Sequence, residues 1–160
     1  MVSNSLIKKL EVIVGKRLQY VTRILDLVCL GFGDIHSETD RYKKEHYIAE
    51  YALHIQCPFR ICYNNVIVLS SFDLYVSNIC SKAEVDWDKN NACLFDDKSL
   101  KFANIFQNQP VESVSLSSLN DLEIKTQDLV ISLFVSDLSQ EAWRFFLTVG
   151  DEEHIVIGGE

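Results

Sequence analysis

The chain has 160 residues and a mass of 18.3 kDa, of which 48% are hydrophobic and 11% aromatic. This is enough apolar material for a sizeable core, so the composition excludes a disordered chain. The net charge of −8 is uneven, because residues 1–44 carry eight Lys and Arg against five Asp and Glu, and residues 45–160 carry seven against eighteen. The balances are therefore +3 and −11, which disfavours nucleic acid and favours a cationic partner, although acidic surfaces also serve solubility alone.

The N-terminal segment predicts a short helix over residues 5–13, followed by strand-like chain and a buried strand at 25–34 that ends at glycines and Asp34. The polar residues 36–46 are expected to form a solvated loop. Lysines interrupt the apolar positions of the first 18 residues, so we expect no secretory signal and a cytoplasmic protein. The apolar runs farther along are too short to cross a bilayer.

Residues 50–63 show the clearest alternation and predict one half-buried strand. The apolar members are Tyr51, Leu53, Ile55, Cys57, Phe59, Ile61 and Tyr63, and the polar members are Glu50, His54, Gln56 and Arg60. Pro58 donates no ladder hydrogen bond, which predicts a bulge or an edge position. Asn64-Asn65 indicates a hairpin turn into a strand at 66–76.

Beyond an irregular segment at 77–97, Asp96-Asp97 are expected to cap a helix over 98–106. Strands are expected at 111–116, 121–126, 128–136 and 152–159, with a turn near Gln127. With no linker and no repeat, residues 1–160 predict a single α+β domain, mainly an antiparallel sheet with one or two short helices on one face.

The five cysteines have irregular spacing and form an odd number: Cys29, Cys57, Cys62, Cys80 and Cys93. This pattern fits neither a disulfide framework nor a zinc site, so we expect free thiols and no metal.

No motif of a known catalytic or cofactor site stands out. The histidines His36, His46, His54 and His154 form no metal-binding pair, and GFGD at 31–34 has two of the three glycines of a dinucleotide fingerprint. We therefore expect no enzyme activity and no cofactor. One alternative stays open, in which Glu50, His54, Gln56 and Arg60 form a polar face for a small ligand or a reaction, although a solvated sheet face has the same pattern.

Two acidic segments favour a binding surface. One places Asp86, Asp88, Asp96 and Asp97 around Trp87, and the other is Asp151, Glu152 and Glu153. An aromatic side chain among carboxylates can anchor an interface whose charges steer a basic partner. Hydrated loops beside a core Trp explain the same residues.

Several short landmarks occur in order: AEYALHIQCPFRI, FDLYVS, DWD, VESV, EAWRFF and HIVIGG. Across residues 15–159 they resemble a family of small uncharacterised bacterial proteins with a YALH-QCPWRI strand and a WR-F…H-V-GG ending, in which Trp stands where this chain has Phe59. That family implies no catalytic residues. In size, composition and acidity the chain also looks like the immunity proteins of bacterial contact-dependent growth inhibition and related toxin–antitoxin systems.

These observations lead to a hypothesis of function. An immunity protein needs a stable scaffold and a complementary surface but no chemistry, because tight binding alone blocks a toxin. We expect a basic, nuclease-type toxin as the partner, and neither nucleic acid nor a membrane. An enzyme or ligand-binding domain is the alternative, and an adaptor domain with an apolar surface patch is a third.

Overall fold

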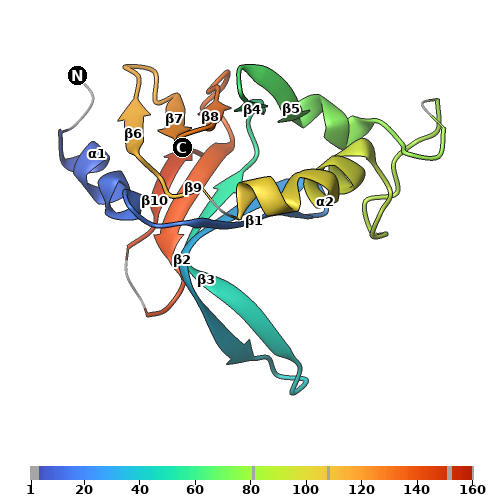
Figure 1. The fold of residues 1–160 in the computed structure, drawn as a ribbon, viewed down its shortest axis with the longest axis horizontal. Helices are drawn as coiled ribbons and strands as arrows, with labels where there is room; N and C mark the ends of the chain where they lie inside the picture. The colour runs from blue at the N-terminus through green and yellow to red at the C-terminus, as the bar shows by residue number, and fades with distance from the viewer. Residues whose placement is uncertain (1–3, 81, 108, 151–152, 160) are drawn as a thin grey trace.

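Two antiparallel sheets form most of the molecule, as Figure 1 shows for the computed structural model. The structure describes residues 4–80, 82–107, 109–150 and 153–159. Sheet 1 has the order β1-β2-β3-β9-β10 and sheet 2 the order β5-β4-β8-β7-β6. The predicted class, α+β and mainly antiparallel, is confirmed. None of the helices in these described ranges is long and apolar enough to span a membrane.

The elements have the following bounds. Sheet 1 consists of β1 (Leu18–Ile24), β2 (Leu27–Thr39), β3 (Glu45–Ile55), β9 (Glu141–Leu147) and β10 (Ile155–Gly158). Sheet 2 consists of β4 (Phe59–Tyr63), β5 (Val66–Ser70), β6 (Ser113–Leu116), β7 (Leu122–Lys125) and β8 (Leu129–Leu133). The helices are α1 (Asn4–Leu10), α2 (Leu94–Phe106) and the 3-10 helices η1 (Glu11–Ile13) and η2 (Ser71–Tyr75).

One apolar core joins both sheets and the helices. It includes Leu53 and Trp143 of sheet 1, Ile61 and Ile131 of sheet 2, and Phe95 of α2, all fully buried. The Trp143 indole N–H donates to the Asn120 carbonyl at 3.1 Å, so its polar atom is satisfied inside the core. Burial of these side chains holds the two sheets together.

The predicted strand at 50–63 is wrong as a single element, because the chain changes sheet in its middle. β3 ends at Ile55 and β4 begins at Phe59, in the other sheet. Pro58 cannot donate to a ladder, and its carbonyl accepts from the Phe134 N–H at 2.8 Å. The predicted burial of Leu53, Ile55, Phe59 and Ile61 is confirmed, Tyr51 is half-buried, and Gln56 and Arg60 are exposed.

The predicted loop at 36–46 is also wrong. β2 and β3 continue as a hairpin to a turn at 40–44, where the Asp40 carboxylate accepts the backbone N–H of Tyr42 and Lys44. In Figure 1 this hairpin arm extends away from the rest of the molecule. Most of its side chains between 34 and 47 are exposed, so it has no apolar stripe for a sequence pattern to reveal.

Other helix and strand boundaries differ from the predicted ones for local reasons. The helix predicted at 98–106 begins at Leu94, and Asp96 contributes to its cap from the third position of the helix, with Cys93 at the N-cap position. The segment predicted as a strand to residue 76 turns into η2 after Ser70, whose N–H donates to Asp73 Oδ2 at 2.9 Å. The Asn64-Asn65 turn is confirmed, with φ of 47° and 64°. No element was predicted over 141–147, which is β9.

Gly31 provides a test of packing on the outer face of sheet 1. A Cβ on Gly31 would overlap the ring of Tyr20, which lies across from it on β1. We expect Gly31→Ala to lower the free energy of unfolding by about 1–3 kcal/mol in urea denaturation. In a Tyr20→Ala background the same change should cost much less, and an equal cost in both backgrounds would show that the ring contact is not the cause.

Candidate functional site

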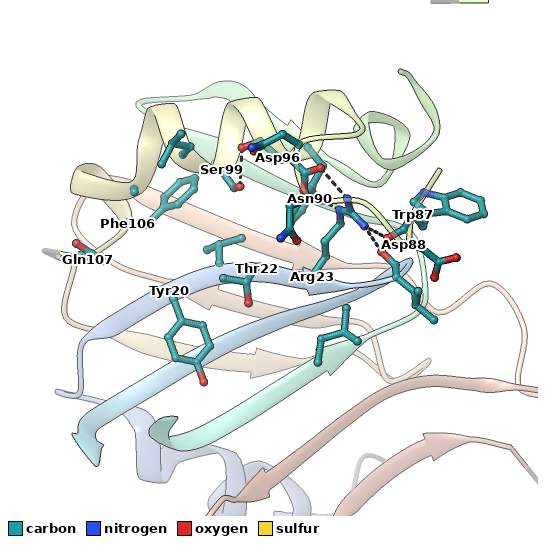
Figure 2. Close-up of a pocket in the computed structure, with 17 residues that line it drawn as sticks. Tyr20, Thr22, Arg23, Trp87, Asp88, Asn90, Asp96, Ser99, Phe106 and Gln107 are labelled. Carbon is teal, nitrogen blue, oxygen red and sulfur yellow. Dashed lines mark hydrogen bonds and ion pairs between the residues drawn. The ribbon is translucent and has the colours of Figure 1, made fainter. Parts of the chain in front are cut away.

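A groove of about 720 Å³ runs between β1 and α2. Figure 2 shows the helix along one side and the strand along the other, with Trp87 and Asp88 at one end and Gln107 at the opposite end. Its lining includes all residues from Tyr20 to Leu25, four residues of the loop before α2, and seven residues of α2 and its C-terminus. Volumes of this size are typical of ligand sites.

The sequence of α2 explains why this space is open. Phe95 and Phe106 are anchored in the core, which fixes the helix beside β1. The lining positions between them include Ser99 and Ala103, one helical turn apart, and these small side chains leave room between helix and strand.

Arg23 of β1 organises one end of the groove. Its guanidinium forms a two-point pair with Asp96, in which Nε donates to Oδ1 and Nη2 to Oδ2, both at 2.7 Å. Nη1 donates to the carbonyls of Leu25 at 2.8 Å and Trp87 at 3.0 Å, and Nη2 also donates to that of Lys89 at 2.9 Å. All five N–H groups of the guanidinium therefore have acceptors, as Figure 2 shows in part.

Asp96 also holds the start of α2. Its Oδ2 accepts the backbone N–H of Ala92 at 2.9 Å and of Cys93 at 3.3 Å, which completes a capping box. Burial by itself would raise the pKa of this carboxyl, but hydrogen bonds from Arg23 and Ala92 outweigh burial and lower it below 3.8. The side chains of Arg23 and Asp96 are only 6% and 13% exposed. Asp96 is thus a structural residue and is not available to a partner.

Trp87 differs from the exposed anchor that its acidic surroundings suggest. It is half-buried, its indole N–H donates to the Leu74 carbonyl at 3.0 Å, and its ring meets Tyr75 edge-on with centroids 5.6 Å apart. The residue fastens the loop before α2 to η2.

The other predicted acidic residues separate into two places. Asp86, Asp88 and Asp97 are exposed near the N-terminus of α2, where Asp86 pairs with Lys89 at 2.9 Å and Asp97 accepts from Asn78 at 3.1 Å. Asp88 has no ion pair within the ranges that the structure describes. Glu153 lies elsewhere and pairs with Lys9 at 3.6 Å, and Asp151 and Glu152 fall outside the described residues.

The alternative ligand face does not assemble. Glu50 pairs with Lys16 at 2.8 Å, Gln56 is exposed in the link between the sheets, and Arg60 lies on β4 with its guanidinium over the Phe134 ring. His54 adjoins a hollow of about 530 Å³ on the outer face of sheet 1, whereas Gln56 adjoins a different hollow of about 480 Å³ at the link between the sheets.

Near this hollow lies a cluster that the strand pattern did not predict. The ring of Phe146 contacts His54 edge-on and stacks on His154, at centroid distances of 4.9 and 4.4 Å. Arg144 lies 3.4 Å from His154 Nδ1 and forms a two-point pair with Glu141 at 2.6 and 3.1 Å. Burial, and then the charge of Arg144, lower the pKa of His54, which favours its neutral form. These residues belong to the YALH, WRFF and HIV landmarks, so the landmarks meet in space.

The cysteines are all free thiols. Burial raises the pKa of Cys29 and of Cys57 to about 11, so neither is an activated nucleophile. Within 4–80, 82–107, 109–150 and 153–159, no three His, Cys, Asp or Glu side chains are grouped so as to hold a metal ion.

The Arg23–Asp96 pair generates a stability prediction. Arg23→Ala leaves the mostly buried carboxylate of Asp96 without its counter-charge and three carbonyls without this donor, so we expect the free energy of unfolding to fall by about 3–5 kcal/mol. The matched control is Arg41→Ala in the exposed turn of the hairpin arm, with an expected loss within about 0.5 kcal/mol. Urea denaturation measures both, and similar losses would refute the role of Arg23.

The same pair predicts a pH dependence. Because the pKa of Asp96 is lower in the folded state than its ordinary 3.8, its contribution is complete above that value and is lost as the pH falls through the folded pKa. The stability difference between the protein and Asp96→Asn should therefore be constant from about pH 7 to 5 and shrink below about pH 4. A difference that stays constant on acidification would contradict the assignment.

Thiol exposure gives a further prediction. Cys80 is exposed, whereas Cys29, Cys57 and Cys93 are buried and have raised pKa values. A maleimide at neutral pH should label Cys80 first in the folded protein and all five cysteines after unfolding. Peptide mapping by mass spectrometry identifies the labelled residue, and Cys80→Ser should remove the fast phase. Early labelling of Cys29 or Cys57 would show that the core opens readily.

Comparisons of the chain with models of known families, with curated proteins and with solved structures found no match. The groove, its acidic end and the His54 hollow are therefore the features from which function has to be inferred. Of these, the groove has the larger volume and adjoins the exposed carboxylates.

Proposed function

We propose that the protein is an immunity protein that binds and neutralises a cationic bacterial toxin, with the groove end at Asp88 as the centre of its binding surface. The observation that carries this proposal is the pair of exposed carboxylates of Asp88 and Asp97 beside an open groove, with the exposed Asp86–Lys89 ion pair next to them. An acidic cluster beside a concave surface favours a basic partner protein whose charge and shape complement both features.

The distribution of ion pairs supports this proposal. Residues 45–160 contain seven Lys and Arg, and four of them pair with carboxylates of the same part of the chain: Lys89, Lys98, Lys125 and Arg144. Asp73 and Glu141, two of the carboxylates that these cations neutralise, are mostly buried. The excess of negative charge is thus left to exposed residues, where it can attract a partner over a distance of about 8 Å at physiological salt.

A nuclease-type toxin fits this surface chemically. Such an enzyme presents Lys and Arg to hold the phosphates of its substrate, and carboxylates at matching positions can occupy those side chains. The same carboxylates would then accelerate association with the toxin and block the toxin's substrate groove. The resemblance in size and acidity to contact-dependent inhibition immunity proteins agrees with this role.

The test is a charge reversal that spares Asp96, because that residue holds the fold. The triple variant Asp86→Lys, Asp88→Lys and Asp97→Lys is compared with an equally charged control, Glu38→Lys, Glu45→Lys and Glu112→Lys, whose exposed positions do not line the groove. The probe is the protein encoded immediately upstream. Stopped-flow association at low salt should slow by about tenfold or more for the first variant only and lose its salt dependence.

Protection of cells is the second readout. Cells that express the upstream protein should survive with the native chain and with the control, and lose protection with the groove variant. If both variants bind equally fast, the groove end is not the contact. If the native chain gives no protection against that protein, the immunity function is refuted.

A further inference from the structure

The outer edge of β1 is an open hydrogen-bonding edge. Ile24 and Leu27 flank the two-residue turn Leu25–Asp26 and close the β1–β2 hairpin. Because bonded and non-bonded pairs alternate in an antiparallel ladder, Tyr20, Thr22 and Ile24 bond to β2, and the N–H and C=O groups of Val21 and Arg23 point away from it. β1 is the outermost strand of sheet 1, and no hydrogen bond to these outward groups occurs within the described ranges.

The same edge is already paired at its N-terminal end. The Lys16 carbonyl accepts from the Val111 N–H at 2.9 Å, and the Leu18 N–H donates to the Gln109 carbonyl at 3.2 Å. A bulge between Leu18 and Tyr20 then shifts the register. Past this bulge the chain that covered the edge has turned toward α2, and the unpaired groups of Val21 and Arg23 lie along the groove.

The side chains along the groove suit an extended chain. Ile24, Leu25 and Leu100 line it and are 64%, 51% and 75% exposed, which gives apolar contacts on both sides. Asp96 neutralises the charge of Arg23. The net charge of the residues that line the groove is therefore negative and comes from Asp88. A segment with apolar side chains and at least one Lys or Arg complements this surface.

We infer that the groove between β1 and α2 takes an extended, basic segment of the partner protein, which pairs with the β1 edge as a sixth strand of sheet 1. This inference rests on the proposed function and specifies how the partner binds. The outward groups of Val21 and Arg23 supply up to four main-chain hydrogen bonds, which give affinity without dependence on sequence. Alternate side chains of the segment would face Ser99, Ala103 and Leu100 on α2, or Thr22 and Ile24 on β1.

The experiment uses the full chain and a display library of random twelve-residue peptides. The native protein should enrich peptides that alternate β-branched or aromatic residues with Lys or Arg. Ala103→Trp fills the groove from the helix side and should weaken the selected peptides at least tenfold. Lys101→Trp, at an exposed position of the same helix outside the groove lining, is the matched control and should bind normally. Circular dichroism checks that both variants fold, and Ser99→Leu repeats the test if Ala103→Trp does not.

Amide hydrogen exchange gives a readout that does not depend on a variant. In the free protein the amides of Val21 and Arg23 should exchange faster than those of Thr22 and Ile24, and a selected peptide should slow them at least tenfold. Enrichment of no such peptide, unchanged binding to Ala103→Trp, or unchanged exchange at Val21 and Arg23 would overturn the inference. If the upstream protein still binds Ala103→Trp but not the charge-reversed variant, the strand pairing fails and the immunity function stands.

Discussion

The guanidinium of Arg23 connects three segments that no backbone ladder joins to one another at this place. It holds the β1–β2 turn through Leu25, the loop before α2 through Trp87 and Lys89, and the first turn of α2 through Asp96. A buried ion pair of this type adds little net stability compared with well-packed apolar residues, but the loss of one partner is costly. Its main effect is geometric, because it keeps the helix at a set distance from β1. The groove exists as long as this distance is kept.

The sequence predicts burial better than it predicts which sheet a residue belongs to. Alternation identified Leu53, Ile55, Phe59 and Ile61 as core residues, because side-chain direction in an extended chain depends on local geometry alone. It could not reveal the change of sheet at Pro58, since Cys57 stays buried and the alternation continues through the break. The hairpin arm was missed for the opposite reason, because it is extended but lacks a buried face.

The candidate site was only partly predictable. The sequence predicted the cluster of Asp86, Asp88, Asp96 and Asp97, but the side chain of Asp96 is mostly buried, and nothing local distinguishes Asp96 from Asp97. The difference comes from Arg23, which lies 73 residues earlier in the chain. The open edge of β1 depends on the order of strands in sheet 1, in which β1 is the outermost strand and pairs with β2 alone among the strands. The residues of β1 alone do not reveal this strand order, because it depends on contacts between segments far apart in the sequence.

The helix beside the open edge also limits the size of a chain that can pair with β1. An uncovered edge strand usually invites a second copy of the same protein to join sheets and aggregate. A strand that belongs to a folded sheet carries its neighbouring strands and covering layers with it, and α2 lies where that bulk would have to pass (Figure 2). A single extended chain has no such bulk. The position of α2 therefore disfavours edge-to-edge pairing of two folded sheets at β1 and leaves room for a single extended chain.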